Sequence, residues 1–213
     1  TQGRATSTSD IDVWIVIDDT DVKKMTRVEL KDKLTAIMNN IAQEIDKNLV
    51  PQAVILSELW QNCYDGKNEL LQLIAMSAPI YDKGMLAAIK IAEVHKTMVL
   101  KKFEKYIVGY VLAGSLIQGR ATPTSDIDVW IVIDDTDVKR MSRIELLERL
   151  RGIIYDYIRE ATALAGVENK LEPQIYLLTD FWQGVKDASP VYFTFIRDGV
   201  PLYDRGTFLP WKR

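Results

Sequence analysis

Histidine and cysteine are almost missing from the 213 residues, because the chain has one of each, His95 and Cys63. A single cysteine excludes an intrachain disulfide framework and a thiolate metal cluster, and it favours a reducing, cytoplasmic setting. A single histidine excludes a zinc site of ordinary composition and leaves no histidine-based catalysis. We expect His95 on the surface of a helix and Cys63 in a partly buried position, with no chemical role for either.

Long apolar runs and an excess of positive charge are missing too. The longest apolar run, residues 106–117, is too short to span a bilayer, so no membrane partner is expected. The net charge of −3 and the pI of about 5.3 argue against binding nucleic acid through bulk positive charge. Binding of nucleic acid through a local basic patch, such as Lys101, Lys102 and Lys105, stays open. With 47% hydrophobic residues, the composition is that of a globular protein with one medium domain or two small ones.

Two segments of the sequence are nearly identical. Residues 1–34 and 117–150 are identical at 26 of 34 aligned positions, and shorter matches follow in the rest of each copy. We interpret this as a tandem duplication of a unit of roughly 100 residues, with domains at 1–93 and 94–213 that pack as an intrachain pseudo-dimer. Higher oligomers stay open. The first copy begins inside the matching region, and we expect that an upstream helix, strand and Gly-Ser turn are missing from it.

Helices and strands alternate in the second copy. The patterns predict strands over 107–113, 126–134 and 174–178 and a helix over 94–105. They also predict a helix from the N-cap Ser142 to about 163, a short helix capped by Thr179, and a helix that starts at Pro190. Ser142 and Glu145 form a capping box, which Thr26 and Glu29 repeat in the first copy. The β-α-β order predicts an α/β (α+β) fold of two tandem units, each a small mixed sheet backed by helices on one face.

The most informative pattern follows the strand at 107–113. Gly114-Ser115 ends this strand, and after ten intervening residues Asp126-Ile127-Asp128 opens the next one. On a strand, Asp126 and Asp128 share one face with alpha carbons about 6.5–7 Å apart. Two carboxylates at that spacing repel each other, and a divalent cation with oxygen ligands, Mg²⁺ or Mn²⁺, relieves the repulsion.

The Gly-Ser turn supplies the other half of a nucleotide site. Glycine lets a phosphate approach the backbone closely. We expect residues 116–118 to start a helix, so that their backbone N–H groups donate to the phosphate. Arg120, on the return loop, is a further phosphate contact. Ser125 either contacts the nucleotide or caps the turn into the strand.

Residues 114–128 resemble the signature of the minimal nucleotidyltransferases of the DNA polymerase β superfamily. The resemblance covers the whole second copy and most of the first. It implies transfer of a nucleoside monophosphate from a nucleoside triphosphate, with ATP as the expected donor, and release of pyrophosphate. Gly114 and Ser115 would hold the triphosphate, while Asp126 and Asp128 would be catalytic and bind the metal ion.

The family also uses a third carboxylate on the neighbouring strand. Here Gln174 occupies the position that we assign to it, and Glu172, two residues earlier, is the other possible third ligand. In the first copy, Asp10 and Asp12 match the metal-binding aspartates, but Val50 replaces Glu172. We therefore expect transferase activity mainly in the second copy, and a binding-only or structural role for the first.

Two other functions stay open. The resemblance also implies a non-catalytic nucleotide-binding or antitoxin-like partner of a helical HEPN-type protein, because related nucleotidyltransferases often work beside such toxins. An RNA-end-modifying transferase is the second alternative, which the acidic pI disfavours. Incorporation of label from ATP would separate an enzyme from a binding protein.

Overall fold

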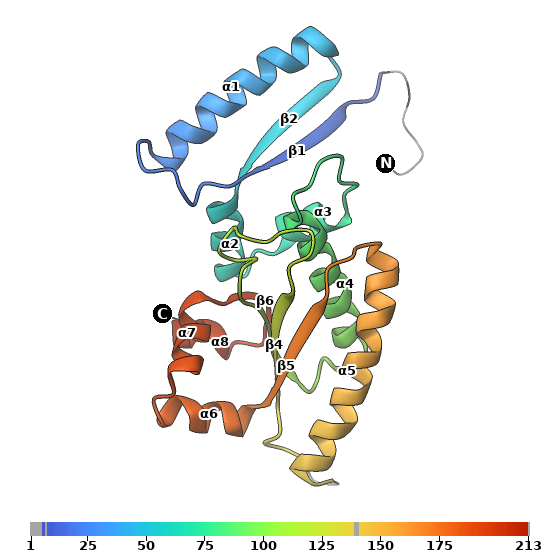
Figure 1. Ribbon diagram of the computed structural model, residues 1–213, viewed down its shortest axis with the longest axis vertical. Coiled ribbons are helices and arrows are strands. Elements are labelled where there is room, and N and C mark those ends of the chain that lie inside the picture. Colours follow the sequence, from blue (N-terminus) through green and yellow to red (C-terminus); the bar gives the residue numbers. More distant parts are fainter. Residues whose placement is uncertain (1–5, 7, 139–140, 213) are drawn as a thin grey trace. The chain divides into compact units, whose positions relative to one another are not determined.

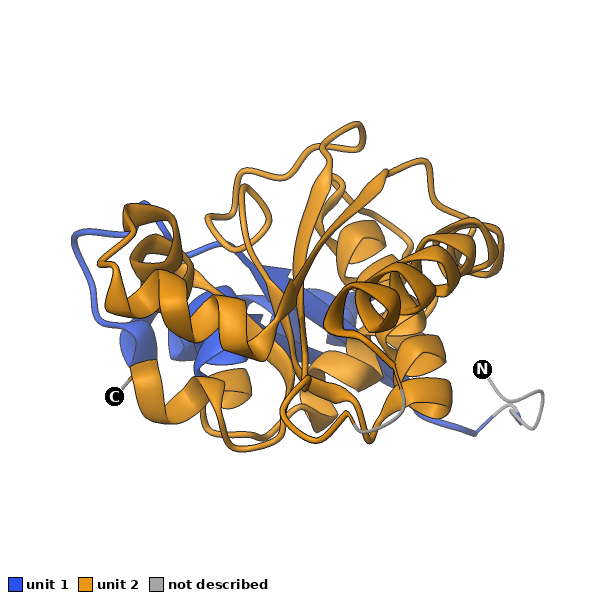
Figure 2. Cartoon of the chain, turned by 90° about the horizontal axis from the view of Figure 1, so that it is seen from below, with its two compact units in different colours: residues 1–61 blue, residues 62–213 orange. Residues whose placement is uncertain are grey.

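The computed structural model describes residue 6 and residues 8–138 and 141–212. The chain divides into two compact units, Thr1–Gln61 (unit 1) and Asn62–Arg213 (unit 2), which Figure 2 shows in different colours. Within the described part of the chain, every helix is too short or too polar to traverse a bilayer.

Unit 1 is built on a βαβ motif. Strands β1 (Ile11–Ile17) and β2 (Leu49–Ile55) form a parallel pair, and helix α1 (Arg27–Ile45) connects them (Figure 1). The helix starts at a capping box: the Thr26 hydroxyl accepts the Glu29 N–H at 3.2 Å, and the Glu29 carboxylate accepts the Thr26 N–H at 2.8 Å. Helix α2 (Leu56–Tyr64) follows β2 directly.

Unit 2 contains a four-stranded mixed sheet, as predicted. Its order is β5-β4-β3-β6, in which β4 and β5 are parallel and β3 runs antiparallel to both of its neighbours. The elements are α3 (Glu69–Met76), α4 (Met85–Phe103), β3 (Ile107–Leu112), β4 (Ile127–Ile133), α5 (Arg143–Ala165), β5 (Leu171–Leu177), α6 (Leu178–Lys186), α7 (Pro190–Asp198), β6 (Val200–Asp204) and α8 (Phe208–Lys212). The capping box at Ser142 and the helix that starts at Pro190 are both confirmed.

Helices cover both faces of this sheet, so the prediction of helices on one face is wrong. Helices α4 and α5 lie on one side, and α6, α7 and α8 lie on the other (Figure 1). The second side has its own apolar core, in which Trp130 and Val132 of β4 pack with Phe181, Phe195 and Phe208. The apolar side chains of β4 alternate between the two faces, and burial on both faces is typical of a central strand.

The expected domain boundary at residues 93 and 94 falls inside α4, which is one continuous helix of 19 residues. The repeat is still visible in local structure. Ile127 of β4 pairs with Leu171 as Ile11 of β1 pairs with Leu49. The two compact units divide between Gln61 and Asn62, whereas the sequence repeat places the domain boundary between residues 93 and 94.

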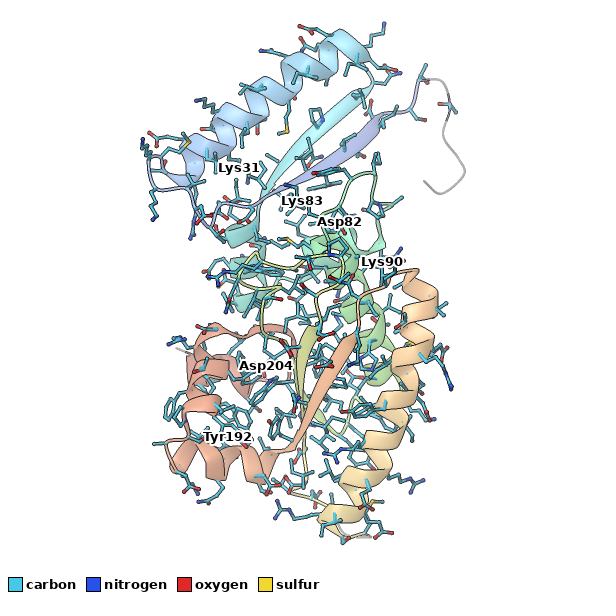
Figure 3. All side chains as sticks on the ribbon, in the orientation of Figure 1. Lys31, Asp82, Lys83, Lys90, Tyr192 and Asp204 are labelled. Atoms are coloured by element: carbon cyan, nitrogen blue, oxygen red, sulfur yellow. The ribbon has the colours of Figure 1, made fainter. Side chains whose placement is uncertain are left out.

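Two aspartates that the repeat equates cap two helices in the same way. Asp82 accepts the backbone N–H groups of residues 84, 86 and 87, and Asp204 accepts those of residues 207, 208 and 209. Figure 3 shows both residues, one at the start of α4 and one just before α8. A carboxylate that satisfies the free amides of a helix N-terminus stabilises that helix.

His95 lies in the core, so its predicted surface position is wrong. The residue is 0% exposed between α4, β3 and α5, with Nδ1 2.9 Å from the Tyr110 hydroxyl and Nε2 3.0 Å from the Ile154 carbonyl oxygen. Since a carbonyl only accepts, Nε2 carries the proton and Nδ1 accepts from Tyr110. Burial lowers the pKa of His95 to about 4, which keeps the ring neutral.

Candidate active site

The Gly-Ser turn packs directly on an aspartate of β4. Gly114 has a φ of +72°, and a Cβ atom placed on it would lie 2.0 Å from Oδ2 of Asp128. Only glycine fits both the left-handed backbone and this close approach. Residues 114–119 form turns instead of the expected helix start, closed by a 3.0 Å bond from the Arg120 N–H to the Ser115 carbonyl oxygen.

Two further carboxylates lie close enough to Asp128 to affect its titration. In the parallel register of β4 and β5, Asp128 lies directly opposite Glu172. Asp126 comes directly before β4, two residues before Asp128. Burial, then the negative charges of Glu172 and Asp126, raise the pKa of Asp128 above its usual value.

The register distinguishes the two candidates for a third carboxylate. Gln174 lies opposite Trp130, one step further along the face from the aspartates, whereas Glu172 is the direct neighbour of Asp128. Trp130 is stacked between Phe195 and Tyr176, with ring centroids 4.0 and 4.5 Å away, and has a packing role.

Lys170 forms an ion pair with Glu172. Its Nζ atom lies 2.5 Å from Oε1 of Glu172, and its side chain is mostly exposed. In the described part of the chain, no three histidine, cysteine, aspartate or glutamate side chains are already at the spacing of metal ligands. The acidic side chains would therefore have to turn toward one another to hold a cation together.

A buried asparagine holds the loop that leads into Asp126. Nδ2 of Asn169 donates to the carbonyl oxygens of Thr122 and Ser125, each at 3.1 Å. The Ser125 hydroxyl accepts the Thr122 N–H at 2.9 Å, so it closes this loop. Sequence reasoning did not single out Asn169, since nothing local indicates a bond to residues more than 40 positions away.

Asp135, and not Thr179, caps helix α6. The Asp135 carboxylate accepts the N–H of Thr179 at 3.1 Å and its hydroxyl at 2.5 Å, and it pairs with Arg143 at 2.6 Å. Unit 1 repeats the arrangement, in which Asp19 accepts the N–H of Ser57 at 3.0 Å. These bonds connect the segment after β4 to the start of α6, at the end of the two strands opposite to the acidic side chains.

A cavity of about 400 Å³ opens beside the Gly-Ser turn. Its walls come from the turn, from β4 and from α7, and include Gly114, Ile117, Gln118, Trp130, Thr194 and Phe195. It is mainly apolar, and Asp198, whose carboxylate accepts two bonds from Arg197, is also among its lining residues. Its size and character are typical of small-molecule sites.

The remaining predicted residues have no side-chain contact with these carboxylates among the contacts of the described residues. Arg120 is exposed on the return loop. In unit 1, Asp10 and Asp12 are exposed, and Asp12 lies opposite Val50, so the described residues give this pair no third carboxylate. The basic patch, Lys101, Lys102 and Lys105, precedes β3, whereas the Gly-Ser turn follows it, so the patch and the site lie at opposite ends of that strand.

Comparison with known proteins agrees with this geometry. Residues 93–183 match the nucleotidyltransferase domain family, a range that holds the Gly-Ser turn, both aspartates and Glu172. A search of curated proteins finds no match. Among solved structures, the chain is similar to a protein from Sulfolobus solfataricus that is provisionally described as a nucleotidyltransferase. The identity is 17%, the coverage is 61% of this chain and 94% of that one, and the TM-score is 0.35.

Proposed function

We propose that unit 2 transfers a nucleoside monophosphate from a nucleoside triphosphate, ATP first among them, to an acceptor, with Mg²⁺ or Mn²⁺ as cofactor. One observation carries this proposal: Asp128 has Gly114 against its carboxylate on one side and Glu172 opposite on the next strand. The match of residues 93–183 to the nucleotidyltransferase domain family supports the same reaction class.

The residues present fit a divalent cation. Carboxylate oxygens are the ligands that Mg²⁺ prefers, commonly one or two of them together with substrate phosphates. The raised pKa of Asp128 reflects a half-buried carboxylate near two other acids, and a cation would offset the cost of its negative charge. When bound, such a cation would neutralise the phosphate charge and stabilise the attacking and leaving oxygens.

The protein's own groups would orient the reactants. The amides of the Gly-Ser turn would hold the β- and γ-phosphates, since close approach to the backbone is open at Gly114. The acceptor hydroxyl would form a bond to the α-phosphorus while the bond to the pyrophosphate oxygen breaks. Glu172 would accept the hydroxyl proton, because it is the carboxylate that faces Asp128 from the neighbouring strand.

The cavity beside the turn would take the rest of the nucleotide. It shares Gly114 with the phosphate-binding turn, so a triphosphate on the turn would extend its sugar and base toward the apolar walls. Residues Thr194 and Asp198 of α7 line the same cavity and offer polar groups to the base.

Pyrophosphate release tests this function. Each of the four ribonucleoside triphosphates is incubated with Mg²⁺ and the protein, with and without a short RNA, and label from the α-phosphate is followed onto RNA and onto protein. We expect release by the wild type, a loss of at least about a hundredfold in Glu172→Gln, and little change in the same-face control Gln174→Ala. Absence of release under all conditions, or equal rates in both variants, would contradict the proposal.

A further inference from the structure

The C-terminal end of helix α7 is held by a lysine of α8, a helix that packs against α7 and β6 (Figure 1). Nζ of Lys212 donates to the carbonyl oxygen of Arg197 at 2.6 Å and to that of Gly199 at 2.9 Å. Arg197 lies in the last turn of α7, and Gly199 is the C-cap residue. Carbonyl groups at a helix C-terminus lack intrahelical partners and carry partial negative charge, so an ammonium group is favourable there.

The backbone that Lys212 holds also belongs to the wall of the cavity beside the Gly-Ser turn. Asp198 and Gly199 are among the lining residues, and Asp198 lies in the sequence between the two residues whose carbonyl groups accept from Lys212. The backbone at Gly199 packs closely on β3, because a Cβ atom placed on it would lie 2.8 Å from Cγ1 of Val111. A displacement of this short stretch would therefore change the shape of the cavity.

The neighbours of Lys212 leave its charge open to change just above neutral pH. Nζ lies 4.0 Å from the centroid of the Tyr64 ring of α2, a cation–π contact. Burial lowers the pKa of Lys212 to about 8, against the opposing effect of Asp198. Arg197 lowers the pKa of Asp198 and keeps it ionised, while burial raises the pKa of Tyr64 to about 12 and keeps it neutral. On the side of β6, the Asp204 carboxylate accepts the amides at the start of α8.

We propose that Lys212 is a positioning residue for nucleotide binding, which holds the end of α7 so that Asp198 and Gly199 keep their places in the cavity wall. This inference rests on the proposed function, because that proposal places the sugar and base in this cavity. Hydrogen bonds from a charged donor are roughly twice as strong as neutral ones. Loss of the charge on Nζ therefore loosens the hold on both carbonyl groups, and nucleotide affinity falls as the pH rises.

Three variants of the full chain test this role. Lys212→Met removes the donor, and Lys212→Arg keeps a cation that does not titrate in the range of the experiment. Lys186→Met removes an exposed charge from the last turn of α6 and is the matched control. The dissociation constant of ATP with Mg²⁺ is measured by calorimetry at pH 7 and at pH 9.5, and kcat for pyrophosphate release is measured at pH 7. Hydrogen exchange of residues 190–199 is followed without nucleotide.

We expect Lys212→Met to bind ATP about tenfold more weakly at pH 7, with a change in kcat below about twofold, because two hydrogen bonds from a charged group are lost. The wild type and Lys186→Met should both lose affinity severalfold between pH 7 and pH 9.5. Lys212→Arg should bind within about threefold of the wild type at pH 7 and should change little with pH. Residues 190–199 should exchange faster in Lys212→Met than in the wild type.

Full ATP affinity in Lys212→Met would overturn the positioning role. The same dependence on pH in the wild type and in Lys212→Arg would overturn the role of the charge, and this comparison decides the matter if Lys212→Met does not fold. A folded protein that binds no ATP, but in which Lys212→Met speeds exchange of residues 190–199, would contradict the proposed function and support the hold on α7.

Discussion

Acid should destabilise this protein through His95 in a way that a single substitution removes. Nδ1 of the neutral ring accepts from the Tyr110 hydroxyl at 2.9 Å, and Nε2 donates to the Ile154 carbonyl oxygen at 3.0 Å. Protonation of Nδ1 would remove the acceptor of the Tyr110 hydroxyl. Burial lowers the pKa of His95 from 6.5 to about 4. The unfolded chain therefore binds a proton more readily than the folded chain between these two values.

The sign and the size of the effect follow from this difference. The stabilising contribution of neutral His95 is fully present above pH 6.5 and is lost as the pH falls toward 4, because protons then favour the unfolded state. At 1.36 kcal/mol per unit of pKa, the loss amounts to about 3 kcal/mol.

Urea unfolding at pH 8 and at pH 4 measures it. His95→Gln keeps a donor and an acceptor in place but cannot titrate, so it carries the same background from carboxylates without the histidine contribution. We expect the free energy of unfolding of the wild type to fall by about 3 kcal/mol more than that of the variant between the two pH values. Equal losses would refute the assignment of a buried neutral histidine.

Three further substitutions and one control, Gly166→Ala, test the site. Gly114→Ala should weaken Mg²⁺-dependent ATP binding at least tenfold, because its Cβ would lie 2.0 Å from the Asp128 carboxylate, whereas Gly166→Ala, with φ of +65° and nothing within 4 Å, should lose about 1–2 kcal/mol of stability and retain binding. Asn169→Ala should cost about 1–3 kcal/mol in urea unfolding, since two carbonyl oxygens lose their donor, and a change below 0.5 kcal/mol would argue against those bonds. Lys170→Met should raise the affinity for Mg²⁺ by at most about fivefold, because an exposed ion pair is worth under about 1 kcal/mol, and an unchanged Mg²⁺ titration would show that Lys170 does not compete for Glu172.

The sequence predicted those features that local patterns determine. The capping boxes at Thr26 and Ser142 and the proline at the start of α7 depend on residues a few positions apart, and all are in the structure. The mixed sheet follows from the order of strands and helices. The shared face of Asp126 and Asp128 stays a prediction, because Asp126 lies just before the first residue of β4.

Features that depend on contacts between distant segments were not predictable in this way. Gln174 and Glu172 share one face of β5, so only the register with β4 shows that Glu172 is the neighbour of Asp128. The core position of His95 depends on α5, which packs over α4 from nearly 60 residues away. The division after Gln61 reflects compact packing, which a repeat in the sequence does not specify.

Strands β1 and β4 have the same sequence and offer the sharpest test of the central claim, which is that Asp128 supports Mg²⁺-dependent ATP binding because Gly114 and Glu172 lie beside it. ATP affinity is measured by calorimetry with and without Mg²⁺ for the wild type, for Asp128→Asn, and for Asp12→Asn, which makes the same change in the same seven-residue sequence of β1. The account predicts that Mg²⁺ strengthens ATP binding at least tenfold in the wild type and in Asp12→Asn but not in Asp128→Asn. The same dependence on Mg²⁺ in all three proteins would contradict it.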